Sequence, residues 1–242
     1  RVGDILQKCE EYLTDINDVI ALGFCVSQEH AQFMSENFCK AGLKADYLIS
    51  GNKNRNELKY KLLSKEINYL FVVDIFNEGI DIPSINTVLF LRPTNSPIVF
   101  VQQLGRGLRK DKNKEFLTVL DFIGNHKKAY LIALSLVGNK AIDKESIKFS
   151  LQNNFADFKN AFISMDEISK NRILKQIENE NFNHLKYLKE QYFEFKSLLN
   201  NKIPKLVDYL AFDDLVNPLN FINESYSYVE FLAKVEDKNE YK

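Results

Sequence analysis

The sequence is poor in cysteine and histidine, and the few that it has are scattered. Its three cysteines, Cys9, Cys25 and Cys39, form no CxxC pair, and its three histidines show no metal-ligand spacing. An odd number of unpaired cysteines is typical of a reducing compartment, in which thiols are structural. We therefore expect a cytoplasmic protein with structural thiols and no metal site of its own.

Long hydrophobic runs and an excess of charge of one sign are also missing. No apolar run approaches the ~20 residues that span a bilayer, and there is no signal peptide. The formal net charge of -1 gives no overall attraction for nucleic acid, although a local basic strip is compatible with it. The chain begins at Arg1, within a helical pattern, and we expect it to be a piece of a longer protein.

The central stretch Leu70–Arg109 carries the pattern around which the rest is organised. Short apolar runs at Leu70–Val73 and Thr87–Leu91 predict strands that are covered on both faces of a parallel sheet. The polar segments Asp74–Asp81 and Arg92–Ser96 follow these runs. They are therefore expected at the carboxyl ends of two parallel strands, where open α/β sheets bind their ligands.

Two motifs within this stretch resemble those of one known family. DIFNEGIDIP at residues 74–83 is similar to motif V, and QQLGRGLR at residues 102–109 is similar to motif VI, of the second RecA-like domain of superfamily 2 (DEAD/DEAH-box) helicases. Both occur in order, roughly twenty residues apart with a strand between them, which makes the resemblance specific. Together with the runs LRPT and LDFIGN, they resemble a restriction- or repair-associated branch of multidomain helicases.

The resemblance implies roles at an ATP site. It assigns Arg106 and Arg109 to the γ-phosphate of an ATP that a neighbouring domain holds, with Gln102 in the same crevice. A guanidinium offers a planar, permanently charged fork that stabilises phosphoryl transfer. Gly79 and Asp81 are assigned to nucleotide binding, the Asp at the ribose. The alternatives are two surface arginines at a helix end, and a Gly turn with a capping Asp.

The resemblance also implies contacts between strand-end loops and a nucleic-acid backbone. The residues concerned are Ser27, Gln28, Ser50, Gly51, Asn77, Glu78, Thr94 and Asn95. Backbone N–H groups and small hydroxyls at such positions hold phosphates without reading base sequence. Ser27 fits the N-cap of a following helix equally well. Val73 stands where many relatives carry Thr, so no hydroxyl contact is expected there.

Several other polar residues have simple structural explanations. Arg55 either belongs to the phosphate-contacting segment that starts at Ser50 and Gly51 or is only a solvated residue at a helix start. Asp121 is expected to cap a strand end, with a general base as the alternative. Gln103 and Lys110 are expected on the surface of their helix.

Alternating strand and helix patterns predict the fold of the first part of the chain. Strands are predicted at Asp18–Val26, Ala45–Ile49 and Glu115–Phe122, and helices at Val2–Thr14, Glu29–Ala41 (stopped by Gly42) and Asn56–Lys65. Short connections between them favour an α/β fold, a parallel RecA-like (P-loop NTPase-like) sheet flanked by helices.

Helical patterns predominate in the remainder, with one strand near Phe162–Met165. Helices are predicted at Glu167–Glu178 (capped by Asp166), Asn183–Leu199, Lys205–Leu210 and Ser225–Val235. We predict a RecA-like domain at residues 1–138 and a mainly α-helical accessory domain at residues 139–242.

Two motifs of ATP-hydrolysing motors are missing from this sequence. It contains no GxxxxGK[ST], and its Asp166-Glu167 pair is assigned to the start of a helix, so the chain alone is not expected to hydrolyse ATP. The resemblance implies that an N-terminal RecA-like domain of the same protein binds ATP and Mg²⁺, and that the other partner is nucleic acid, DNA rather than RNA. The hypothesis is an ATP-dependent helicase. The alternatives are a duplex-translocating motor subunit of a restriction enzyme and a non-enzymatic scaffold.

Overall fold

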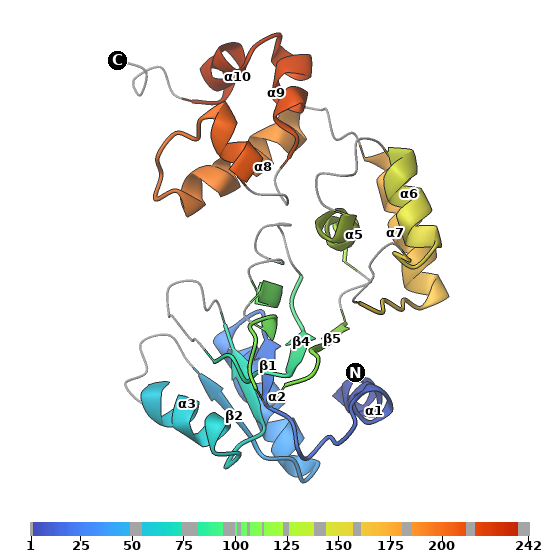
Figure 1. Ribbon diagram of the computed structural model, residues 1–242, viewed down its shortest axis with the longest axis vertical. Helices are drawn as coiled ribbons and strands as arrows, with labels where there is room; N and C mark the ends of the chain where they lie inside the picture. The colour runs from blue at the N-terminus through green and yellow to red at the C-terminus, as the bar shows by residue number, and fades with distance from the viewer. Residues whose placement is uncertain are drawn as a thin grey trace. The chain divides into compact units, whose positions relative to one another are not determined.

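The chain forms two compact units in the computed structural model (Figure 1). The described residues are 2–48, 55–73, 82–93, 100, 103–105, 107–112, 114–122, 126–137, 144–156, 161–180, 185–211 and 216–236. Unit 1 comprises Arg1–Pro93 and Gln102–His126, and unit 2 comprises Thr94–Val101 and Lys127–Lys242. The domain boundary at residue 138 stays a prediction.

Unit 1 is built on five parallel strands. They are β1 (Ala21–Phe24), β2 (Ala45–Leu48), β3 (Tyr69–Val72), β4 (Thr87–Phe90) and β5 (Thr118–Asp121). Their order in the sheet is β2-β3-β1-β4-β5, and every neighbouring pair is parallel. The chain thus builds the sheet first on one side of β1 and then on the other, as in doubly wound folds. The prediction of a RecA-like parallel sheet is confirmed.

Two helices cover one face of the sheet. α1 (Val2–Tyr12) and α2 (Gln28–Lys40) share a buried apolar cluster with alternate residues of the strands. From α1 and α2 the cluster contains Ile5, Cys9, Ala31, Met34 and Phe38, and from the strands it contains Ala21, Tyr69, Phe71 and Leu89. α3 (Arg55–Leu63) buries Leu58 and Leu62 and contacts β2 and β3. Because strand residues alternate between faces, the buried Phe24 and Phe90 belong to the opposite face, where their rings stack at 5.4 Å.

Gly23 in the middle of β1 makes room for an aromatic ring of the next strand. A Cβ at this position would lie 2.4 Å from Cδ1 of Phe71. The ring of Phe71 has little freedom to move away, because Phe38 packs against it edge-to-face at 4.9 Å. A glycine is therefore needed here for close packing.

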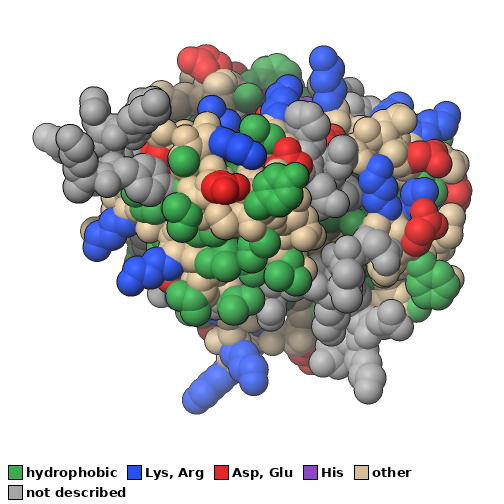
Figure 2. Space-filling model, turned by 90° about the horizontal axis from the view of Figure 1, so that it is seen from above, with side chains coloured by type: hydrophobic (Ala, Val, Ile, Leu, Met, Phe, Trp, Pro, Cys, Tyr) green, Lys and Arg blue, Asp and Glu red, His purple; other side chains and the backbone are tan. Residues whose placement is uncertain are grey.

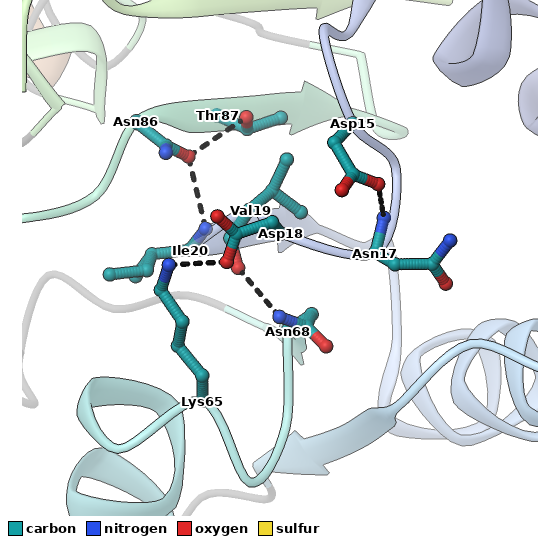
Figure 3. A network of polar contacts seen from close by, with 9 residues as sticks. All are labelled: Asp15, Asn17, Asp18, Val19, Ile20, Lys65, Asn68, Asn86 and Thr87. Carbon is teal, nitrogen blue, oxygen red and sulfur yellow. Dashed lines mark hydrogen bonds and ion pairs between the residues drawn. The ribbon is translucent and has the colours of Figure 1, made fainter.

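Side chains hold the strands together at the amino edge of the sheet (Figure 3). The side-chain oxygen of Asn86 accepts a hydrogen bond from the Ile20 N–H at 3.0 Å, and the side-chain amide of Asn68 donates to the Val19 carbonyl at 3.1 Å. Lys65 also bonds to Asp18 across this edge. These bonds continue the pairing of β1 with β3 and β4 beyond the four residues of each strand.

Helix ends in unit 1 follow their capping signals. α2 ends at Lys40, and Gly42 adopts a positive φ of 86°, which an L-residue with a side chain rarely adopts. The N–H of Leu43 then returns to the carbonyl of Phe38 at 3.0 Å. The predicted stop at Gly42 is confirmed.

The first three helices of unit 2 share one core. α5 (Tyr130–Val137), α6 (Lys144–Gln152) and α7 (Glu167–Asn179) bury an apolar cluster that includes Leu131, Ile147, Leu151, Ile173 and Ile177. The predicted cap of α7 is confirmed, because the Asp166 carboxylate accepts from the Ser169 N–H at 2.9 Å.

The prediction of a strand near Phe162–Met165 is wrong. Residues 161–166 have no strand structure. Ile163 and Met165 pack against the α5–α7 core while Phe162 is 91% exposed. One-sided packing of an irregular segment thus produces the same alternation that a strand would show.

An aromatic core holds the last helices of unit 2. α8 (Leu185–Leu198), the short 3₁₀ helix η3 (Leu206–Ala211), α9 (Pro218–Ser225) and α10 (Tyr228–Val235) surround Tyr192, Phe195, Tyr209, Phe221 and Phe231. Phe221 and Phe231 lie with ring centroids 4.6 Å apart. The aromatic residues of this cluster are core residues, as their helical spacing predicts, whereas Tyr226 and Phe193 are exposed.

The predicted last helix, Ser225–Val235, is in fact interrupted. Tyr226 adopts a left-handed conformation (φ 62°) that ends α9 at Ser225. Ser227 then caps α10, its hydroxyl accepting from the Glu230 N–H at 3.1 Å. The apolar spacing continues across the break and therefore hides it in the sequence.

Surface charges of both signs are mixed. Figure 2 shows Lys and Arg side chains interspersed with Asp and Glu over the face that it displays, with hydrophobic side chains exposed among them. This distribution agrees with the formal net charge of -1. Among the helices that the structure describes, none is long and apolar enough to cross a membrane.

Candidate functional site

All five strands of unit 1 end at the same level, which defines one edge of the sheet. The backbone register aligns Leu48, Val72, Phe24, Phe90 and Asp121 across the sheet. The chain segments that follow these residues therefore leave the sheet on its carboxyl edge, where open parallel sheets bind ligands. This edge is the candidate functional site.

Ser27 and Gln28 lie where β1 gives way to α2 on this edge. Ser27 has an extended backbone, and its hydroxyl oxygen accepts a hydrogen bond from the His30 N–H at 3.2 Å. The same hydroxyl hydrogen-bonds the Glu29 carboxylate and, with the backbone N–H of Glu29, lowers the pKa of that exposed group. The capping role of Ser27 is confirmed, while its contact with nucleic acid stays a prediction. Gln28 is exposed at the first position of the helix.

Arg92 lies at the exit of β4, next to the exit of β1. The Leu91 N–H donates to the Phe24 carbonyl at 3.0 Å, which joins the two strand ends. Burial raises the pKa of the Cys25 thiol, and the positive charge of Arg92 lowers it in part. Burial dominates and raises the pKa of Cys25 to about 12, so the thiol stays protonated at neutral pH. Cys25 is thus a structural thiol, as predicted, beside a half-buried arginine.

Arg55 begins α3, the helix that follows β2. Its side chain is half-buried, and its terminal nitrogen Nη2 is enclosed without a hydrogen-bond partner among the described residues. The prediction of a solvated residue at a helix start is therefore wrong in one respect, because part of the guanidinium is shielded from water.

The helix of the QQLGRGLR motif is present in the described residues. Residues 103–105 and 107 are helical, and the Leu108 N–H donates to the Leu104 carbonyl at 3.1 Å. Arg109 follows directly and is exposed, as is Lys110. The predicted placement of Gln102 and Arg106 in the ATP crevice lies outside the described residues.

The prediction that Gln103 lies on the helix surface is wrong. Its side chain is buried, with 1% of the residue exposed. Neither its side-chain nitrogen nor its oxygen has a hydrogen-bond partner among the described residues. Sequence reasoning placed it outside because a second glutamine in a polar motif resembles a solvated residue. The motif gives no signal for this burial.

Lys114 joins the two motif-bearing segments, a role that sequence reasoning missed. Its ammonium donates to the Pro83 carbonyl at 2.6 Å and to the Gly107 carbonyl at 2.7 Å. Pro83 closes the first motif and Gly107 lies in the second. Desolvation lowers the pKa of Lys114, while nearby Asp111 opposes that shift. No sequence signal marks these bonds, because the two carbonyls become neighbours only in the folded chain.

The remaining predicted site residues lie outside the described residues. They are Ser50, Gly51, Asn77, Glu78, Gly79, Asp81, Thr94, Asn95, Gln102 and Arg106. Their assigned roles stay predictions. Among the residues with a described position, no group of three or more His, Cys, Asp or Glu side chains is arranged to hold a metal ion.

Comparison with known proteins gives similarities that fall mainly on unit 1. Residues 5–111 match the family described as "Helicase conserved C-terminal domain". A Saccharomyces cerevisiae protein named as the ATP-dependent helicase IRC3 is 34% identical over 124 residues, which make up 50% of this chain and 18% of that protein. The endonuclease subunit of the Escherichia coli type I restriction enzyme EcoKI is 26% identical over 136 residues, 49% of this chain and 12% of that subunit.

The chain spans less than a fifth of the length of these two relatives. Among solved structures, the yeast DEAD-box splicing factor Prp28 has a similar fold, with a TM-score of 0.50 and 16% identity. That similarity covers 72% of this chain and 35% of that protein.

Proposed function

Residues 5–111 belong to the C-terminal domain family of superfamily 2 helicases, and from this premise we propose that the whole protein is an ATP-dependent nucleic-acid helicase. In this proposal unit 1 is the second of two RecA-like motor domains. The proposal is carried by the match of residues 5–111 to this family. These residues contain both motifs and the first four strands of the five-stranded parallel sheet.

Arg106 and Arg109 are proposed to act on an ATP that is held mainly by the first motor domain. ATP and Mg²⁺ would bind to that domain, and closure of the two domains would bring both guanidiniums to the γ-phosphate. There they would stabilise the charge that develops during transfer. Gln102, Gly79 and Asp81 would complete the nucleotide crevice. The exposure of Arg109 supports this role, because a partner domain can reach the side chain.

Nucleic acid is proposed to bind along the carboxyl edge of the sheet. α2 is a 13-residue helix whose N-terminus, at Ser27 and Gln28, carries a partial positive charge. Arg92 adds a full charge beside it. Such groups attract phosphates irrespective of base sequence, as movement along a strand requires. Closure on ATP and reopening after hydrolysis would alternate the grip of the two domains and move the protein along the strand.

Replacing Arg109 with alanine in the full-length protein tests the arginine role. We expect nucleic-acid-stimulated ATPase to fall by on the order of 10³-fold. The melting temperature is expected to stay unchanged, because the side chain is exposed. Lys110→Ala is the matched control, since it removes one positive charge from the adjacent exposed position and should keep the activity. ATPase retained by Arg109→Ala would reject the proposed role.

Translocation along duplex DNA without strand separation is a second proposal. The similarity to the EcoKI subunit supports it, because that protein belongs to a restriction enzyme. Strand-displacement and triplex-displacement assays on the full-length protein distinguish the two functions. A helicase separates the strands of a duplex, whereas a translocase displaces a third strand and leaves the duplex intact.

A further inference from the structure

A pocket of about 280 Å³ in unit 2 is lined by three cationic side chains. It lies between the segment that begins α5 and the second half of α7. Its lining includes Lys127 from the α5 side and Arg172 and Lys175 from α7, with one carboxylate, Glu180. Unit 2 has no assigned activity, and the two motifs of the motor domain contribute nothing to this pocket.

The fold itself sets the cations at the pocket. Ile173 and Ile177 are buried in the core of α5–α7. Positions 172, 175 and 176 of α7 therefore lie outside this core and line the pocket beside the start of α5. The side-chain oxygen of Gln176 accepts a hydrogen bond from the backbone N–H of Tyr130 at 3.1 Å. That bond fixes the first turn of α5 against α7 and so keeps Lys127 close to the α7 cations.

The single carboxylate of the pocket is engaged within the unit. Glu180 hydrogen-bonds the hydroxyl of Tyr130, whose pKa is raised first by burial and then by the charge of Glu180. Lys127 and Lys175 are exposed, and neither forms an ion pair with any carboxylate that the structure describes. The lining therefore has three positive charges against one negative charge, and two of the three cations are open to a ligand.

We propose that this pocket binds a backbone phosphate of the nucleic-acid strand on which the motor acts. The inference rests on the proposed function, since that function supplies the strand. A phosphate on a polymer fits better than a free phosphate compound, because small-molecule sites enclose most of their ligand. Here Lys127 and Lys175 are exposed and would contact only one side of a passing strand. The net charge of -1 makes a local cation cluster necessary for such a contact.

The salt dependence of binding tests the proposal. Binding of the 242-residue chain to a fluorescent single-stranded oligonucleotide is measured by anisotropy between about 50 and 200 mM salt, for the wild type and for Lys127→Ala/Lys175→Ala. Each lysine–phosphate contact on a single strand contributes about 0.7 to the slope of log K against log salt. We expect the double variant to lower the slope by about 1.4 and to weaken binding roughly tenfold at the lowest salt. Its melting temperature should match that of the wild type.

The matched control is Lys202→Ala/Lys205→Ala. It also removes two exposed lysines from unit 2, near η3 instead of at the pocket, and it should retain the wild-type slope. An unchanged slope in Lys127→Ala/Lys175→Ala, or an equal loss in the control, would overturn the inference and leave the proposed function standing.

Two further outcomes separate the remaining explanations. A wild-type chain that fails to bind the oligonucleotide at the lowest salt would contradict nucleic-acid binding by this chain altogether. A free-phosphate site would show a different pattern. Inorganic phosphate would raise the melting temperature of the wild type only, while the double variant would bind the oligonucleotide as tightly as the wild type. That pattern would also overturn the inference.

Discussion

In unit 1 a single lysine side chain joins two segments that no strand pairing connects. Lys114 satisfies two backbone carbonyls at once, those of Pro83 and Gly107. Desolvation lowers its pKa, and the two hydrogen bonds offset part of the cost of burying its charge. Because one carbonyl belongs to each motif-bearing segment, the position of one segment depends on the other.

Lys114→Met tests this dependence. The methionine keeps the aliphatic packing but removes both hydrogen bonds, which leaves two part-buried carbonyls without their donor. We expect the free energy of unfolding of unit 1 to fall by about 1–3 kcal/mol. Urea denaturation of the chain measures it. Lys112→Met, at an exposed position of the same turn, should change stability by less than about 0.5 kcal/mol. Equal effects of the two variants would contradict the role of Lys114.

At the scale of elements, a buried ion pair joins α8 to the end of α10. The Lys196 ammonium contacts both carboxylate oxygens of Glu236 at 2.8 and 2.9 Å, and the Tyr192 hydroxyl donates to the same carboxylate. The Lys196 and Glu236 side chains are only 11% and 3% exposed. A charge buried to this extent is tolerated because its partner and a hydroxyl replace water.

Lys196→Met should therefore be strongly destabilising. Removing one partner leaves the Glu236 carboxylate buried and uncompensated, and we expect unit 2 to lose about 3–5 kcal/mol of unfolding free energy. Lys128→Met removes one partner of the exposed pair Lys128–Glu190 and should cost at most about 1 kcal/mol. Adding Glu236→Gln to Lys196→Met removes the unpaired charge and should restore part of the loss. If the single and double variants are equally unstable, lost packing and not the buried charge is the cause.

Elements with local signals were predictable from the sequence. Ser27, Gly42 and Asp166 each act through hydrogen bonds or backbone angles within a few residues, and all three were placed correctly. The alternation of partly buried and exposed residues at 162–165 led to the wrong prediction of a strand, because an irregular segment packed on one side shows the same pattern. The bond of Lys114 to Pro83 joins residues 31 apart in sequence, and the motifs carry no information on it or on the burial of Gln103.

For the candidate site, the sequence allowed us to infer that it lies at the carboxyl edge of the sheet. It did not allow us to infer which side-chain contacts are made there. Strand ends follow from apolar runs, so the carboxyl edge was predictable before any coordinates. Whether a side chain at this edge only caps a helix or also contacts a ligand depends on the ligand, which the sequence of this chain does not describe. The capping hydroxyl of Ser27 shows why, since the same geometry serves both roles.

At the scale of the whole molecule, each apolar cluster formed by the described residues lies within one unit. The sheet cluster of unit 1 shares no residue with the two helical clusters of unit 2. Clusters built from separate sets of residues are expected to unfold in separate cooperative transitions.

Calorimetry should therefore resolve more than one unfolding transition in the chain. Lys114→Met is expected to lower only the transition of unit 1, and Lys196→Met only a transition of unit 2. A single transition that both variants shift together would contradict the independence of the two units.

The contrast between the two edges of the sheet has a consequence for protein engineering. Asn86, Asn68 and Lys65 add side-chain bonds at the amino edge to the backbone pairing of the strands. At the carboxyl edge the backbone pairing continues past the strand ends, as in the bond from the Leu91 N–H to the Phe24 carbonyl. Loop grafts and insertions at the carboxyl edge should then leave the scaffold intact. Such a sheet suits the exchange of loops between related proteins.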